Sequence, residues 1–129
     1  MELTLIDYSN QYFSSPPRQR RGKFIQVLSE DTEYIVMSPR EQSTFHANIA
    51  ERFFSSLGVR GQYNHKRDNF RIGHPGWTIL GGGHWELDED AGKLTLSGLS
   101  MAYGRFQSSG GLAVRLEKLL PGYRVSVTS

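Results

Sequence analysis

The sequence contains no cysteine among its 129 residues. This absence excludes disulfide bonds, thiol nucleophiles and zinc–thiolate centres. Long apolar runs are also missing, since no stretch approaches the roughly 20 residues that a membrane-spanning helix needs. The first residues, MELTLIDYS, carry two acids and no base, which is untypical of a secretory signal peptide. These absences favour a cytoplasmic protein without membrane partners.

A large excess of either charge is absent too, because 15 Lys and Arg residues oppose 13 Asp and Glu, a formal net charge of +2. The bases cluster in PPRQRRGKF (16–24) and between Arg60 and Arg71. Such clusters suit an anionic ligand at one site better than long-range binding of DNA. For each single arginine, the alternative interpretation is an ordinary solvent-exposed charge on a loop. With 37% hydrophobic residues, we expect one folded domain over residues 1–129.

Alternating and β-branched segments predict about six strands. Two helices are predicted as well. Ser38 to Glu41 resembles a capping box, followed by the stripe Phe45, Ile49, Phe53, Leu57 and a stop at Gly58. The second helix is expected over 109–122. Residues 59–77 are expected to form mostly a long loop, with a short irregular strand within it as the alternative. The expected strands come from 3–8, 22–29, 33–37, 77–82, a hairpin over 84–100 and 123–129.

This pattern predicts an α+β fold, with a single mixed β-sheet of about six strands flanked by two α-helices. No repeat, low-complexity tract or linker divides the chain.

Motifs for a bound metal, nucleotide or other cofactor are absent. His46 stands alone on its predicted helix, and His65 and His74 are too far apart to be helical metal ligands. We therefore expect no metal and no cofactor. The stretch GGGHWE matches neither the P-loop pattern nor the pattern of a dinucleotide-binding turn. We therefore expect its glycines to allow another backbone or a ligand to approach closely, and not to bind a nucleotide. The G-x-S-x-G motif that presents the nucleophilic serine of many hydrolases is absent. The sequence therefore gives no support to a Ser-His-Asp triad, although residue counts alone do not exclude one.

His46 lies at the edge of the apolar face of its predicted helix. Two interpretations remain open: a packed, hydrogen-bonded core histidine, or a catalytic base. An ordinary pKa near 6.5 would leave it mostly neutral and able to accept a proton. With a helix start at Ser38, His46 is too far past the cap for the helix dipole to matter much.

The stretch SGLSMAYGRF (97–106) ends an alternating strand in a small, irregular turn without charge until Arg105. Together with TFHANI, GKFIQVLS, LGGGHWELDEDAGKLTLSGLSMAYGRF and PGYRVSV, it resembles the protein-histidine phosphatase family, also called the janus or ocnus family. The resemblance covers residues 22–129. It implies a mixed sheet flanked by helices, in agreement with the fold expected from the residues alone.

The resemblance also implies roles for single residues. His46 falls on the family's catalytic histidine, and Lys23 falls on the lysine near the bound phosphate. Ser100, Met101 and Ala102 fall on the loop whose backbone N–H groups cradle phosphate oxygens, and free N–H groups of a turn do form an anion nest. One residue departs from the family: this chain has His84 where an arginine is expected after the triple glycine. Unlike arginine, the shorter histidine ring cannot make a bidentate phosphate contact.

The implied activity is metal-independent hydrolysis of phosphohistidine in proteins or peptides. His46 acts as general base, and Lys23 and the 100–102 loop bind the phosphoryl group, with His84 as a further binding residue. Partners are then phosphorylated proteins or peptides and phosphate-like anions. The alternative is a non-catalytic phosphate or phosphopeptide binder of the same fold. A nucleic-acid binder using Tyr63, Phe70, Arg67 and Arg71 is the weakest interpretation, and we expect no nucleic-acid partner.

Overall fold

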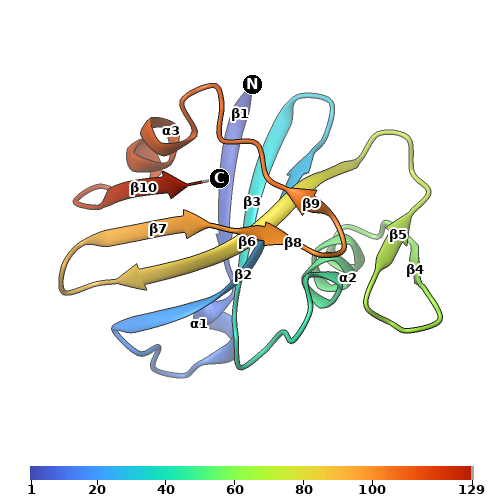
Figure 1. Cartoon of the computed structure of the whole chain (residues 1–129), viewed down its shortest axis with the longest axis horizontal. Coiled ribbons are helices and arrows are strands. Elements are labelled where there is room, and N and C mark those ends of the chain that lie inside the picture. Colours follow the sequence, from blue (N-terminus) through green and yellow to red (C-terminus); the bar gives the residue numbers. More distant parts are fainter. Residues whose placement is uncertain (129) are drawn as a thin grey trace.

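The computed structural model describes residues 1–128 and contains one curled mixed sheet with three helices beside it (Figure 1). The main path of the sheet runs β1-β3-β2-β6-β7-β10, and two short strands, β8 and β9, attach to β6. The strands of this sheet are β1 (Glu2–Asp7), β2 (Gln19–Leu28), β3 (Thr32–Pro39), β6 (Thr78–Asp88), β7 (Lys93–Ser97), β8 (Leu99–Ser100), β9 (Gly104–Arg105) and β10 (Arg124–Thr128). The predicted α+β class with a mixed sheet of about six main strands is confirmed.

The sheet is mixed because its two outer pairs are parallel, as is the short pairing of β9 with β6. β1 runs parallel to β3 and β10 parallel to β7, whereas β3, β2, β6 and β7 pair antiparallel. The sheet curls between these ends, so that β1 and β3 run steeply in Figure 1 while β7 and β10 run across it. The remaining elements are the helices α1 (Ser9–Tyr12), α2 (His46–Ser56) and α3 (Leu112–Leu119), and the separate hairpin of β4 (Gly61–Tyr63) and β5 (Phe70–Ile72).

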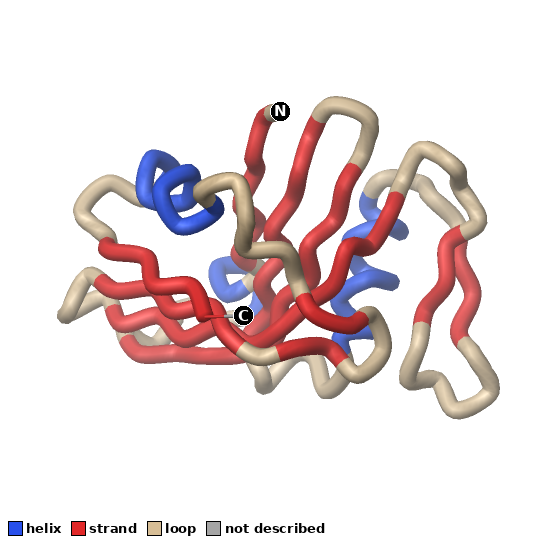
Figure 2. Tube along the Cα trace, turned by 45° about the horizontal axis from the view of Figure 1, so that its top comes forward, coloured by secondary structure: helices blue, strands red, loops and turns tan. Residues whose placement is uncertain are grey.

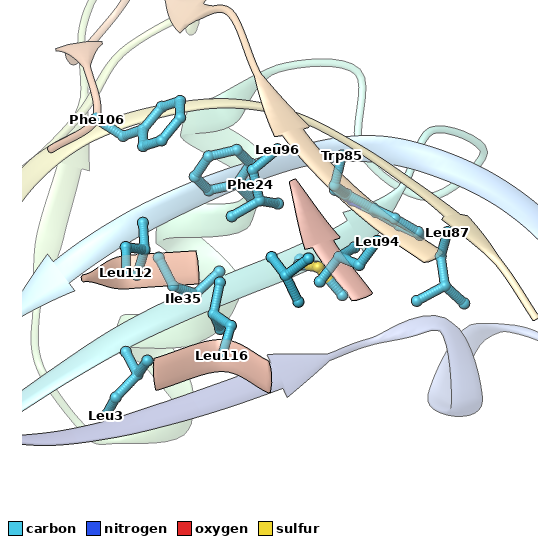
Figure 3. Packing of buried hydrophobic residues seen from close by; sticks show 12 residues of the cluster. Leu3, Phe24, Ile35, Trp85, Leu87, Leu94, Leu96, Phe106, Leu112 and Leu116 are labelled. Atoms are coloured by element: carbon cyan, nitrogen blue, oxygen red, sulfur yellow. The ribbon is translucent and has the colours of Figure 1, made fainter. Parts of the chain in front are cut away.

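Two hydrophobic cores form because successive side chains of a strand point to opposite faces. Phe24 lies in the core under α3, where it meets Phe106 edge-on with ring centroids 5.0 Å apart (Figure 3). Its neighbour Ile25 lies in the other core with Phe53 of α2. Figure 2 shows these two helices apart, beside different parts of the sheet. Within residues 1–128, no helix is long and apolar enough to cross a membrane.

The predicted start of the first long helix at Ser38 is wrong. Ser38 and Pro39 continue β3, and the buried Ser38 hydroxyl bonds Ser43 Oγ at 2.7 Å instead of capping a helix. α2 begins only at His46, where the Asn48 side chain accepts a hydrogen bond from the Phe45 N–H at 2.9 Å. The capping device therefore lies seven residues further along, and His46 is the first residue of the helix.

Other boundaries differ less. The predicted loop over 59–77 contains the β4–β5 hairpin, which packs on the α2 core through Tyr63 and Phe70. The predicted strand 77–82 and the first arm of the predicted hairpin are one continuous strand, β6. α3 is shorter than the predicted 109–122, and the four-residue helix α1 was not predicted.

The triple glycine permits close approach of backbones, as the sequence analysis predicted. A Cβ on Gly81 would collide with the carbonyl oxygen of Arg105, and one on Gly83 would collide with that of Ser97. A Cβ on Gly82 would lie 3.0 Å from His46 Cδ2 and 3.2 Å from Ser100 Cβ. β6 therefore crosses the 97–106 segment at a distance that any larger residue would prevent.

We expect Gly81→Ala to lower the free energy of unfolding by about 1–3 kcal/mol, the usual range for overpacking a tight site. Gly73→Ala is the matched control, because a Cβ there meets nothing within 4 Å. Urea unfolding of both variants measures the difference. Equal stability of the two variants would contradict the tight crossing.

Candidate functional site

A pocket of about 560 Å³ lies where β2, β6, the start of α2, the turn after β8 and the β4–β5 hairpin meet. It brings together five of the six predicted site residues: His46, Lys23, His84, Met101 and Ala102. Ser100, the sixth, does not line it. The complete lining is Lys23, Phe45, His46, Asn64, Asp68, Asn69, His84, Leu99, Met101 and Ala102.

Lys23 and His84 are direct neighbours across β2 and β6, so their side chains leave the same face of the sheet. Lys23 Nζ donates a hydrogen bond to the Thr44 carbonyl oxygen at 2.6 Å and lies 5.8 Å from the centroid of the Phe45 ring. Trp85 Nε1 donates to the Lys23 carbonyl at 3.1 Å, which fixes the strand beneath the lysine. The ammonium group is thus held beside the beginning of α2.

His46 is 6% exposed, and its imidazole is oriented by one hydrogen bond. Its Nε2 lies 2.8 Å from the carbonyl oxygen of Gly83. A carbonyl oxygen only accepts, so Nε2 carries the hydrogen in the neutral ring and Nδ1 keeps its lone pair. The ring of His84 lies 5.9 Å away, centroid to centroid. The geometry supplies a neutral imidazole with one nitrogen able to accept a proton.

Burial lowers the pKa of His46 from about 6.5 to about 4, and the nearby Lys23 and His84 act in the same direction. The hydrogen bond with Gly83 opposes this shift without cancelling it. Because His46 is the first helical residue, the positive end of the α2 dipole also disfavours its protonation. The expectations of an ordinary pKa and of a negligible dipole are therefore both wrong, and His46 is neutral at neutral pH.

The turn after β8 lines the pocket and contains backbone N–H groups that have no partner among the described residues. Ser100 pairs with Gly104 in the ladder, and its buried Oγ accepts the Tyr103 N–H at 3.0 Å. Within residues 1–128, the N–H groups of Met101 and Ala102 donate to no other group. Met101 is 94% exposed. Two adjacent, unused N–H groups in a turn are suited to an anion.

The β4–β5 hairpin forms a wall of the pocket that the sequence analysis did not assign. Tyr103 attaches it to the turn: its hydroxyl donates to the Phe70 carbonyl at 2.7 Å and accepts the Phe70 N–H at 3.1 Å. Burial raises the pKa of this hydroxyl to about 12, so it stays protonated. The tract YNHKRDNF has the Asn and Asp residues of a turn, but a turn signal does not reveal what the turn covers.

The remaining basic residues lie elsewhere. Arg21 and Arg40 line a separate hollow of about 570 Å³ together with Glu86. Of the residues considered for nucleic acid, Phe70 is buried against Tyr63, and the Arg67 guanidinium lies over the Tyr63 ring at 4.3 Å. Phe70 therefore belongs to the core.

No family model matches this chain, and no curated protein matches it. The family inferred from the motifs stays a prediction.

The lowered pKa of His46 predicts a pH dependence of stability. Between about pH 6.5 and pH 4 the unfolded chain binds a proton at His46 and the folded chain does not. The free energy of unfolding should therefore decrease as the pH falls through this window, by about 3 kcal/mol in total at about 1.4 kcal/mol per unit. Above the window both states are neutral at this residue, and below it both are protonated.

His46→Gln is the matched variant, since its amide nitrogen can keep the hydrogen bond with Gly83. Urea unfolding at several pH values should show a steeper loss for the wild type than for His46→Gln. Parallel pH profiles would show that the His46 pKa is not lowered.

Proposed function

We propose that this protein hydrolyses phosphohistidine in proteins or peptides without a metal ion, as a member of the protein-histidine phosphatase family. The observation that carries the proposal is one pocket in which a neutral, oriented His46 lies beside Lys23 and two unused N–H groups. These are the parts that phosphoryl transfer needs: donors for the phosphoryl oxygens and a base for the nucleophile. A cytoplasmic location is part of this proposal and fits the absence of cysteine.

The phosphoryl group binds with its oxygens toward Lys23 Nζ and the N–H groups of Met101 and Ala102. A positively charged ammonium and backbone N–H donors stabilise charge on these oxygens and position the phosphorus for in-line attack. His84 is a further donor at the same wall. The exposed position of Met101 leaves room for a peptide chain to approach the turn.

His46 Nδ1 accepts a proton from the water that attacks the phosphorus. The P–N bond breaks as the new P–O bond forms, and its electron pair goes to the leaving nitrogen. The other nitrogen of the substrate ring keeps its proton, so the leaving group is a neutral imidazole. Because this leaving group is good, the reaction has less need of a metal ion than hydrolysis of a serine phosphate ester. Phospholysine and small phosphoramidates are further substrates with the same bond.

The second proposal is a non-catalytic phosphate or phosphopeptide binder with the same pocket. The low pKa of His46 favours it, since a base with a pKa of about 4 accepts a proton weakly at neutral pH. A bound phosphoryl dianion would raise that pKa and improve the base. Turnover separates the two proposals.

Release of phosphate from a phosphohistidine peptide, with and without a chelator, tests the activity. We expect turnover that the chelator does not change. His46→Gln should lower turnover by about 10²–10⁴-fold, the usual contribution of a positioned base. Its affinity for inorganic phosphate should change far less, because Lys23 and the backbone supply most of the binding.

Wild-type protein that binds phosphate but releases none from the peptide would establish the binder. A folded His46→Gln protein that hydrolyses at the wild-type rate would remove His46 from the mechanism and leave it a packed residue of the helix.

We expect His84→Arg to tighten the binding of inorganic phosphate by about tenfold, because a permanent forked cation replaces a shorter ring. Isothermal titration measures the affinity. His74→Arg adds the same charge outside the pocket and is the control for a general charge effect. Equal affinities of the two variants would place the residue 84 side chain outside the phosphate site.

A further inference from the structure

The pocket has walls of opposite charge. On the side formed by β2, β6 and the start of α2 lies the positively charged Lys23, next to the imidazole rings of the neutral His46 and of His84, and on the hairpin side lies one carboxylate, Asp68. Lys66 and Arg67 are neighbours of Asp68 in the hairpin turn, but neither lines the pocket. Asp68 is the only acidic residue among the described lining residues. A carboxylate beside a phosphate site needs an explanation, because it repels the phosphate.

Asp68 is held in place by its own turn. Its Oδ1 accepts a hydrogen bond from Asn64 Nδ2 at 2.7 Å, and its backbone N–H donates to Asn64 Oδ1 at 3.0 Å. Within residues 1–128 its Oδ2 has no hydrogen-bond or ion-pair partner. Asp68 is exposed to solvent, so this oxygen is accessible to a ligand.

The hairpin keeps Asp68 at a defined place relative to the phosphate-binding turn. Tyr103 bonds both backbone groups of Phe70, and Asn69 Nδ2 donates to the Ala102 carbonyl at 3.4 Å. Asn69 directly follows Asp68, and Ala102 carries one of the free N–H groups. The hairpin that carries Asp68 is therefore linked by hydrogen bonds to the turn that carries the free N–H groups.

A ligand that fits both walls carries a negative and a positive charge close together. Histidine phosphorylated on one ring nitrogen has this character when the second nitrogen is protonated: the phosphoryl group is anionic and the ring is cationic. A phosphate ester of serine, threonine or tyrosine has no such cation, and Asp68 only repels it.

We propose that Asp68 determines specificity by accepting a hydrogen bond from the protonated second nitrogen of the phosphohistidine ring. This inference rests on the proposed function. The contact keeps that nitrogen protonated while water attacks the phosphorus. When the P–N bond breaks, its electron pair stays on the leaving nitrogen, and a neutral imidazole departs with the proton still on the second nitrogen.

The test compares Asp68→Asn with Asp31→Asn. Asparagine at 68 can still accept the bond from Asn64, so the turn is retained while the charge is removed. Asp31 lies outside the pocket, in the turn between β2 and β3, and its variant has the same change in net charge. Binding affinity is measured for three probes: inorganic phosphate and two peptides of one sequence that carry phosphohistidine or phosphotyrosine at the same position. For the phosphohistidine peptide kcat/KM is measured as well.

For Asp68→Asn we expect kcat/KM for the phosphohistidine peptide to fall about tenfold, the effect of one partly solvated charge pair. Affinity for inorganic phosphate should rise or stay the same, and binding of the phosphotyrosine peptide should strengthen. The preference for phosphohistidine over phosphotyrosine, measured by binding, should therefore decrease even if turnover is slow. Asp31→Asn should change none of these values.

An unchanged preference in Asp68→Asn would overturn the role of Asp68 and leave the proposed function intact. Parallel loss of phosphate and peptide binding would also overturn it, since it would show that Asp68 only supports the turn. Wild-type protein that neither binds nor hydrolyses the phosphohistidine peptide would contradict the proposed function itself, and this inference with it.

Discussion

The crossing of β6 with the 97–106 segment is the constraint on which the site depends. Gly81, Gly82 and Gly83 have no side chains, so the backbones of Ser97 and Arg105 approach β6 closely. The same stretch leaves space for the His46 ring and presents the Gly83 carbonyl that orients it. Glycine here is a requirement of close packing, because each position would place a Cβ against backbone or ring atoms. Lys23 and the 101–102 turn then meet around one pocket.

Burial of His46 has two consequences that act together. It lowers the pKa of the ring, so the imidazole is neutral where an exposed histidine would be partly charged. It also leaves the Gly83 carbonyl as the partner of Nε2, which assigns the free lone pair to Nδ1. The cost of this arrangement is a weaker base. A phosphoryl dianion bound at Lys23 would offset that weakness, which couples binding of the anion to the strength of the base.

Local patterns were sufficient for the main strands β1, β2, β3, β7 and β10, for the mixed sheet and for the position of His46 at a buried helix face. They failed at Ser38, where a good capping sequence lies in a strand, because pairing with β2 and burial of the hydroxyl outweigh a local cap. The wall containing Asp68 was not predicted, since turn residues indicate a turn but not its neighbours. The roles of Lys23, Met101 and Ala102 came from resemblance to a family, and the structure adds that they line the same pocket as His46.

The central claim is that the turn after β8 and His46 form one anion site, and a phosphate titration of ¹⁵N-labelled protein followed by NMR tests it most directly. The account predicts saturable shifts of the Met101 and Ala102 amide resonances, together with shifts of the His46 ring nitrogens. The resonances of the residues that line the hollow with Arg21 and Arg40 should not shift. Saturable shifts confined to that hollow, with the amides of Met101 and Ala102 unaffected, would contradict the account.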